Sequence, residues 1–242
     1  MTRFFVDALP KQSDEIVLTG ENAKHAKVLR LKCDEEVLVC DGQGEECLCK
    51  VSWVREEIGL EIMDRRTSDS EAAVRVSVYM AFPKADKLEH VIQKATELGA
   101  FEIVAFPSAR CISKPDDKSL TKKLERWQKI AASAAEQSGR GRIPEVLTLP
   151  SYKAALERAV QADKALLFYE NERATTLRMA LQSGAYKTVS LLTGPEGGLE
   201  EKEVQQAVDA GLLVCTLGKR ILRCETAPLC ALSAVMYDAG EF

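Results

Sequence analysis

The sequence predicts an α/β protein in which a small β-barrel domain precedes a larger domain built on a parallel sheet. From Ala73 onward, apolar strand-like segments alternate with amphipathic helical segments, which is typical of a parallel sheet covered by helices. The first 70 residues instead contain short strand-like segments separated by turn-rich sequence. Residues 66–71 are polar and unperiodic, which indicates a linker. We therefore expect two domains, residues 1–70 and residues 73–242.

The first domain is expected to contain one helix and several short strands. The helix covers residues 21–30. The turn-rich sequences DGQGEE and REEIG separate the later strands. The expected strands are residues 3–6, 36–40, 47–55 and 59–65. Short strands of this kind resemble a small β-barrel.

The second domain begins with an apolar strand at residues 74–82. A helix follows at residues 84–98, with one apolar face and Gly99 as its end. A long helix is expected at residues 119–138 and a final one at 226–237. The remaining strands are expected at residues 103–106, 165–169, 189–193 and 213–217.

Composition gives the broad class. Hydrophobic residues make up 46% and charged residues 29%, as in an ordinary soluble globular protein. No run approaches the roughly 18 apolar residues of a membrane helix, and the N-terminus lacks a signal-peptide pattern, so we expect a cytoplasmic protein without membrane contact. The eight cysteines form no CxxC pair and lie far from the two histidines. We therefore expect no metal, and cysteines that serve as small buried apolar residues.

The charge is unevenly distributed. Residues 1–73 hold 10 Lys/Arg against 16 Asp/Glu, whereas residues 110–142 hold 9 against 4. The basic segment includes a row on the expected long helix, opposite its apolar face: Lys118, Lys122, Arg126 and Lys129. A charge row is often only a solvated helix face. Because this row has a single neighbouring carboxylate, Glu125, we favour contact with nucleic acid.

Two loops follow expected parallel strands. Gly194-Pro-Glu-Gly-Gly198 comes directly after the strand at 189–193, and its glycines would let a ligand approach the backbone. The loop lacks the Gly-Lys-Ser/Thr of a P-loop and is not GxGxxG. A plain tight turn is the alternative interpretation.

The second loop, Leu217 to Thr226, follows the strand at 213–217 and carries Arg220, Arg223 and Glu225. It could be a surface helix entry with capping charges. Loops at the carboxyl ends of parallel strands, however, are where α/β proteins bind ligands. Two such loops on successive strands favour one shared pocket.

These segments resemble a known family. Thr193-Gly-Pro-Glu-Gly-Gly-Leu199 and Leu217-Gly-Lys-Arg-Ile-Leu-Arg-Cys-Glu-Thr-Ala227 are similar to the cofactor loops of the ribosomal small-subunit RNA uridine-N3 methyltransferases, the RsmE type of the SPOUT superfamily. The similarity extends over essentially the whole chain. Cys111 and Cys224 stand where Ser and Thr are commoner in the family. Further matching segments are Lys84-Ala-Asp-Lys87, Lys94-Ala-Thr-Glu-Leu-Gly99, and Ala134-Ala-Glu-Gln-Ser-Gly-Arg140 before Ile143-Pro144.

The resemblance implies a PUA-like, RNA-binding barrel followed by a SPOUT methyltransferase domain with a C-terminal trefoil knot. It implies a homodimer whose pocket lies at the subunit interface. The implied activity is S-adenosylmethionine-dependent methylation of N3 of a uridine in 16S ribosomal RNA, with free RNA or the small ribosomal subunit as partner. A sulfonium already activates the methyl group, so this reaction needs no metal.

The resemblance points to the two loops as the cofactor site, and the chemistry of the reaction and the charge pattern suggest roles for further residues. Glu225 could accept the N3 proton, and the Arg223 guanidinium could stabilise the resulting negative charge. The expected cofactor-binding residues are Thr193, Gly194, Glu196, Gly197, Gly198, Leu217, Gly218, Ile221 and Leu222. The expected RNA-binding residues are Arg110, Lys122, Arg126, Lys129, Gln137 and Arg140.

Two other functions remain open at this point. A SPOUT enzyme acting on a transfer-RNA ribose would be expected to lack the N-terminal barrel. A non-catalytic RNA-binding protein would be expected to bind RNA without the cofactor.

Overall fold

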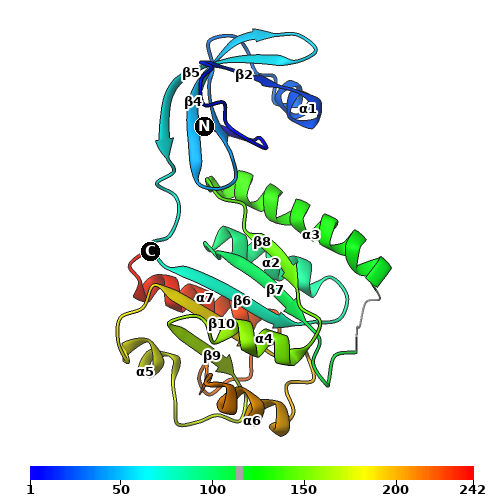
Figure 1. Ribbon diagram of the computed structural model, residues 1–242, viewed down its shortest axis with the longest axis vertical. Coiled ribbons are helices and arrows are strands. Elements are labelled where there is room, and N and C mark those ends of the chain that lie inside the picture. The colour runs from blue at the N-terminus through cyan, green and yellow to red at the C-terminus, as the bar shows by residue number, and fades with distance from the viewer. Residues whose placement is uncertain (113–116) are drawn as a thin grey trace. The chain divides into compact units, whose positions relative to one another are not determined.

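The computed structural model describes residues 1–112 and 117–242. The chain divides into two compact units (Figure 1). One consists of Met1–Glu71 together with Ala135–Ile143, and the other of Ala72–Ala134 together with Pro144–Phe242. The short segment 135–143 therefore differs from the expected division, in which it belongs to the second domain. It groups with the N-terminal unit through partners such as Glu71, which no local sequence pattern reveals.

The N-terminal unit is built on a five-stranded sheet with the strand order β1-β3-β4-β5-β2. The sheet is antiparallel apart from the β1–β3 pair, and its apolar residues surround a core that includes Phe4, Leu18 and Leu60. The sequence analysis missed the four-residue β2. The elements are β1 (Thr2–Phe5), β2 (Glu15–Leu18), α1 (Gly20–Val28), β3 (Glu36–Cys40), β4 (Glu45–Val54) and β5 (Ile58–Thr67).

The C-terminal unit contains a six-stranded sheet in the order β11-β9-β10-β6-β7-β8, and every pairing is parallel. Nearly every residue of the central strands is buried, which is why they appear in the sequence as continuous apolar runs. The predicted α/β class is confirmed. The strands are β6 (Arg75–Ala81), β7 (Glu102–Phe106), β8 (Glu145–Thr148), β9 (Lys164–Phe168), β10 (Thr188–Thr193) and β11 (Leu213–Cys215).

Helices connect these strands. The helix expected from residue 84 begins at Lys87, because Ala85 has a positive φ of 54° that a right-handed helix cannot contain. None of the helices in the described parts of the chain is long and apolar enough to cross a bilayer. The helices are α2 (Lys87–Glu97), α3 (Asp117–Ser138), α4 (Tyr152–Ala159), α5 (Leu177–Gln182), α6 (Glu201–Ala210) and α7 (Thr226–Asp238).

Candidate active site

A cleft of about 490 Å³ lies in the C-terminal unit. Three chain segments provide most of its lining: residues 168–173 after β9, 193–199 after β10 and 216–224 after β11. Lys87 at the start of α2 and Ala227 in α7 complete it. All three segments leave the carboxyl ends of parallel strands, which is the usual ligand-binding edge of such a sheet.

The structure brings together all nine residues that the sequence analysis assigned to cofactor binding. They line this one cleft although they come from two loops. These residues are Thr193, Gly194, Glu196, Gly197, Gly198, Leu217, Gly218, Ile221 and Leu222.

Glycine is required in the loop after β10 for steric reasons. Gly198 has a φ of 68°, and its N–H donates to the Pro195 carbonyl at 2.9 Å, which closes a tight turn. A Cβ on Gly194 would lie 3.0 Å from Leu199 Cγ and 3.1 Å from the Gly198 carbonyl carbon. The loop therefore brings its own backbone close together, and larger residues at these positions would open it.

Arg110 supports this loop. Its Nη1 donates to the Gly197 carbonyl at 2.9 Å, and a Cβ on Gly197 would lie 3.2 Å from the Arg110 Cβ. This side chain, which is an expected RNA contact, thus packs beside the loop after β10.

The loop after β11 leads into α7. Gly218 has a φ of 106°, and its N–H donates to Thr216 Oγ1 at 3.2 Å. Arg223 lines the cleft, and its carbonyl accepts the N–H groups of Thr226 and Ala227 at the start of α7. Glu225 occupies the N-cap position of α7. The two expected catalytic residues therefore lie on one loop, two residues apart.

Lys87 is a site residue that sequence reasoning missed. Its Nζ lies 3.2 Å from Glu196 Oε1 and 3.2 Å from Glu225 Oε2. The motif Lys84-Ala-Asp-Lys87 belonged to the family resemblance, but nothing local gave this lysine a role. The segment after β9, which contributes Glu170 and Arg173 to the lining, was also missed because no glycine motif marks it.

The environment of Glu225 weakens it as a proton acceptor. Burial alone would raise the pKa of this carboxyl, but hydrogen bonds from its own backbone N–H, the Cys224 thiol and Lys87 together lower the pKa. Burial raises the pKa of Cys224 to about 12, so its thiol stays protonated at neutral pH. A carboxylate with a lowered pKa is ionised at neutral pH but is a poorer base.

The basic row on α3 is exposed, yet one of its members is paired. Arg126 Nη2 lies 2.7 Å from Glu89 Oε2 on α2, whereas Lys122 and Lys129 are exposed. The local sequence shows only Glu125 beside this row, because Glu89 lies 37 residues away from Arg126 along the chain.

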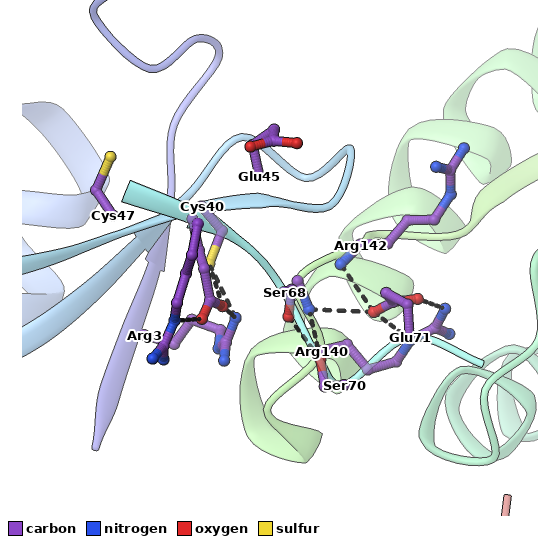
Figure 2. A network of polar contacts seen from close by, with 12 residues as sticks. Arg3, Cys40, Glu45, Cys47, Ser68, Ser70, Glu71, Arg140 and Arg142 are labelled. Atoms are coloured by element: carbon purple, nitrogen blue, oxygen red, sulfur yellow. Dashed lines mark hydrogen bonds and ion pairs between the residues drawn. The ribbon is translucent and has the colours of Figure 1, made fainter. Parts of the chain in front are cut away.

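Arg140 does not fit the RNA-binding role that the sequence analysis gave it. Its side chain is only 5% exposed and its Nη2 lies 2.6 Å from Glu71 Oε2 (Figure 2). The other oxygen of Glu71 accepts the backbone N–H groups of Gly141 and Arg142, each at 3.1 Å. Arg140 therefore fixes the segment after α3 within the N-terminal unit. Because its guanidinium is buried and paired, Arg140 is not retained among the candidate RNA-binding residues. Gln137 is exposed.

The N-terminal sheet also contains a buried carboxylate, that of Glu46. Its side chain is 1% exposed and lies 2.7 Å from Arg3 Nη1 and 2.8 Å from Arg66 Nε. Arg3 Nη1 also contacts Cys40 Sγ at 3.0 Å. The charge of Glu46 is thus compensated on both oxygens, as a buried ion must be.

Among the described residues, no group of three or more His, Cys, Asp or Glu side chains is arranged to hold a metal ion. The polar groups that line the cleft come from glycine backbone and from lysine, arginine, glutamate, threonine, tyrosine and cysteine residues.

Comparison with known families identifies the class. Residues 70–236 match the model of an RNA methyltransferase domain, and residues 18–53 match that of an RNA methyltransferase PUA domain. The cleft described above lies within the first of these matches, which defines the class of the protein as an RNA methyltransferase.

Individual relatives identify the family within the RNA methyltransferases. The chain is 38% identical to the ribosomal RNA small subunit methyltransferase E of Bacillus subtilis (strain 168), over 98% of this chain and 97% of the relative. A crystal structure of the Neisseria gonorrhoeae ribosomal RNA small subunit methyltransferase E bound to S-adenosyl methionine has a TM-score of 0.88 and 34% identity, covering 98% of this chain and 97% of that one. A Legionella pneumophila protein in complex with the same cofactor has a TM-score of 0.85 and 27% identity, covering 98% of both chains. The chain belongs to the ribosomal RNA small subunit methyltransferase E family.

Proposed function

We propose that this protein transfers a methyl group from S-adenosylmethionine to N3 of a specific uridine in 16S ribosomal RNA. One observation carries the proposal: two glycine-bearing loops line a single cleft in a fold shared, over 98% of the chain, with a relative whose structure contains this cofactor. The similarity includes the N-terminal domain, which an enzyme that methylates a transfer-RNA ribose would be expected to lack. This favours ribosomal RNA as the substrate.

The residues of the cleft fit S-adenosylmethionine. The cleft has a volume of about 490 Å³, which is in the range of small-molecule sites. Its glycines let backbone groups contact a ligand directly. We assign the nine cleft residues of Thr193–Gly198 and Leu217–Leu222 named above to holding the cofactor. The sulfonium supplies an activated methyl group, so the protein needs to position the two reactants and assist the loss of one proton.

We assign Arg223 to stabilising the negative charge that forms on the uridine carbonyl oxygens as the N3 proton leaves. Arg223 lines the cleft and is exposed, so a base entering the cleft could reach it. Glu225 was the expected proton acceptor. Its pairing with Lys87 and its lowered pKa favour an anchoring role instead, and leave the proton to solvent.

The charges around the cleft suit a polyanionic substrate. Arg173, Lys219, Arg220 and Arg223 all line it and are all exposed. Lys122 and Lys129 on α3 and the exposed Gln137 are further candidates for RNA contact.

We assign RNA binding also to the PUA-like residues 1–70 and methyl transfer to residues 73–242. We further propose that the protein is cytoplasmic and works as a homodimer.

The direct test is cofactor binding combined with methyl transfer. Calorimetry should show S-adenosylmethionine binding to the purified protein, and radiolabelled methyl groups should pass to 16S ribosomal RNA or small subunits but not to transfer RNA. Binding of RNA without the cofactor would indicate a non-catalytic RNA-binding protein. Label on transfer RNA alone would indicate the ribose methyltransferase.

A further inference from the structure

Lys87 connects the two loops that line the cleft. Glu196 belongs to the loop after β10 and Glu225 to the loop after β11, and the Lys87 ammonium lies 3.2 Å from a carboxylate oxygen of each. All three side chains are partly shielded from water, with exposed fractions of 29% for Lys87, 27% for Glu196 and 18% for Glu225. The shielding strengthens the attraction relative to a surface ion pair.

The order of the strands shows why such a connection matters. In the sheet, β9 lies between β10 and β11, so the last two do not pair with each other. Their carboxyl ends are therefore roughly 10 Å apart, two strand spacings, and no shared ladder fixes one loop against the other. A side chain from α2 that contacts both loops supplies this missing constraint.

We propose that Lys87 is a positioning residue that holds the two cofactor loops at the separation that cofactor binding requires. The inference rests on the proposed function. It assigns to Lys87 no contact with the reacting atoms and makes it act through Glu196 and Glu225.

Further contacts fix both carboxylates in place. Glu196 Oε1 also accepts the backbone N–H of Lys84 at 2.9 Å, so the same group orders the chain that leads into α2. Glu225 Oε2 accepts from the Cys224 thiol at 3.2 Å. Each carboxylate thus has a donor of its own besides Lys87, and within the described part of the chain the Lys87 ammonium is the group that contacts both.

The charges make a specific prediction possible. One ammonium compensates two carboxylates, so removing it leaves two like charges facing each other across the loops. Those charges should push the loops apart. Removing one carboxylate as well should relieve the repulsion and restore part of the cofactor affinity.

The experiment is calorimetry of S-adenosylmethionine binding to the full-length protein and its variants. Lys87→Met keeps most of the aliphatic stem and should weaken binding on the order of tenfold, which corresponds to the removal of one charged hydrogen bond. Lys87→Arg keeps the charge and should recover most of this affinity. Lys94→Met is the matched control, because Lys94 is on the same helix and paired with Glu97 at 2.8 Å but does not line the cleft. It should bind the cofactor like the parent.

The double variant Lys87→Met/Glu225→Gln separates positioning from a general loss of structure. Positioning predicts tighter binding than in Lys87→Met alone, whereas a role only in overall stability predicts weaker binding. Parent-like affinity in Lys87→Met, or a double variant weaker than Lys87→Met, would overturn the inference. A parent protein that does not bind S-adenosylmethionine would overturn the proposed function and this inference with it.

Discussion

At the scale of single residues, we expect the glycines of the loop after β10 to determine whether the cofactor can reach its backbone. Gly197 offers the cleanest test, because its φ is not positive whereas Gly198 has a φ of 68° that would strain any replacement. Gly197→Val should weaken S-adenosylmethionine binding at least about tenfold, since the side chain would displace Arg110 or enter the cleft. Calorimetry measures the affinity, and thermal unfolding checks that the fold is kept. A folded variant with the affinity of the parent would show that the loop is only a turn.

The positions of candidate site residues were predictable where one stretch of sequence carried the signal, and not where partners meet from distant segments. Gly194 to Gly198 follow an apolar strand directly, so the sequence alone places them at the ligand-binding edge. The Lys87–Glu225 pair joins residues 138 positions apart, and the Arg140–Glu71 pair joins residues 69 apart. The second pairing removed a candidate RNA contact, because a buried guanidinium that already has a carboxylate partner cannot reach a phosphate.

At the scale of elements, the N-terminal sheet depends on one buried carboxylate. Burial would raise the pKa of Glu46, but hydrogen bonds from Arg66 and Arg3 lower it overall. A group whose pKa is lower in the folded state stabilises the fold above its unfolded pKa of about 4.3, and this contribution disappears as the pH falls through the folded value.

Glu46→Gln should therefore reduce the free energy of unfolding by about 3 kcal/mol at pH 7, because Arg3 is left buried without a counter-charge. The difference between parent and variant should shrink as the pH falls below the unfolded pKa of about 4.3 and through the lower folded pKa, where the carboxyl of the folded parent becomes protonated. Urea unfolding at pH 7 and at acidic pH measures both quantities. If parent and variant differ in free energy of unfolding by the same amount at both pH values, the stabilising role of the Glu46 charge is contradicted.

The exposed face of α3 allows a second test at this scale. Lys122→Ala/Lys129→Ala should weaken binding of a 16S ribosomal RNA fragment at all sequences alike, because lysines contact phosphates rather than bases. The log–log dependence of affinity on salt should flatten by roughly 0.7–0.9 for each phosphate that the variant no longer neutralises. Arg126→Ala serves as the control and should change the slope less, because Arg126 already pairs with Glu89. An unchanged slope in the double variant would leave α3 as a merely solvated helix.

The elements themselves were largely predictable, and the exceptions have local causes. The alternation of apolar strands and amphipathic helices in the C-terminal domain was confirmed as a parallel sheet. The short strands β2 and β8 were missed because neither shows a clear period in its sequence. The positive φ of Ala85 moved the start of α2, and nothing in its sequence indicated that backbone conformation. The order of the strands, and the trefoil knot that the family resemblance implies, lie beyond what periodicity can show.

At the scale of the whole molecule, we expect a homodimer. Ile221 on the loop after β11 is 81% exposed and Tyr237 on α7 is 74% exposed, and both are large apolar side chains that a second copy could cover. Light scattering at micromolar concentration should give twice the mass of 26.7 kDa. Ile221→Arg should shift the equilibrium toward the monomer. A monomeric mass for the parent would contradict the proposed assembly and a pocket shared between subunits.

The central claim is that this chain methylates N3 of a uridine in 16S ribosomal RNA. The most direct measurement is mass spectrometry of 16S ribosomal RNA from cells with and without the gene, combined with complementation by the parent and by Gly197→Val. The account predicts one N3-methyluridine that disappears on deletion, returns with the parent and does not return with Gly197→Val. An unchanged set of modified nucleotides in the 16S ribosomal RNA of the deletion strain would contradict it.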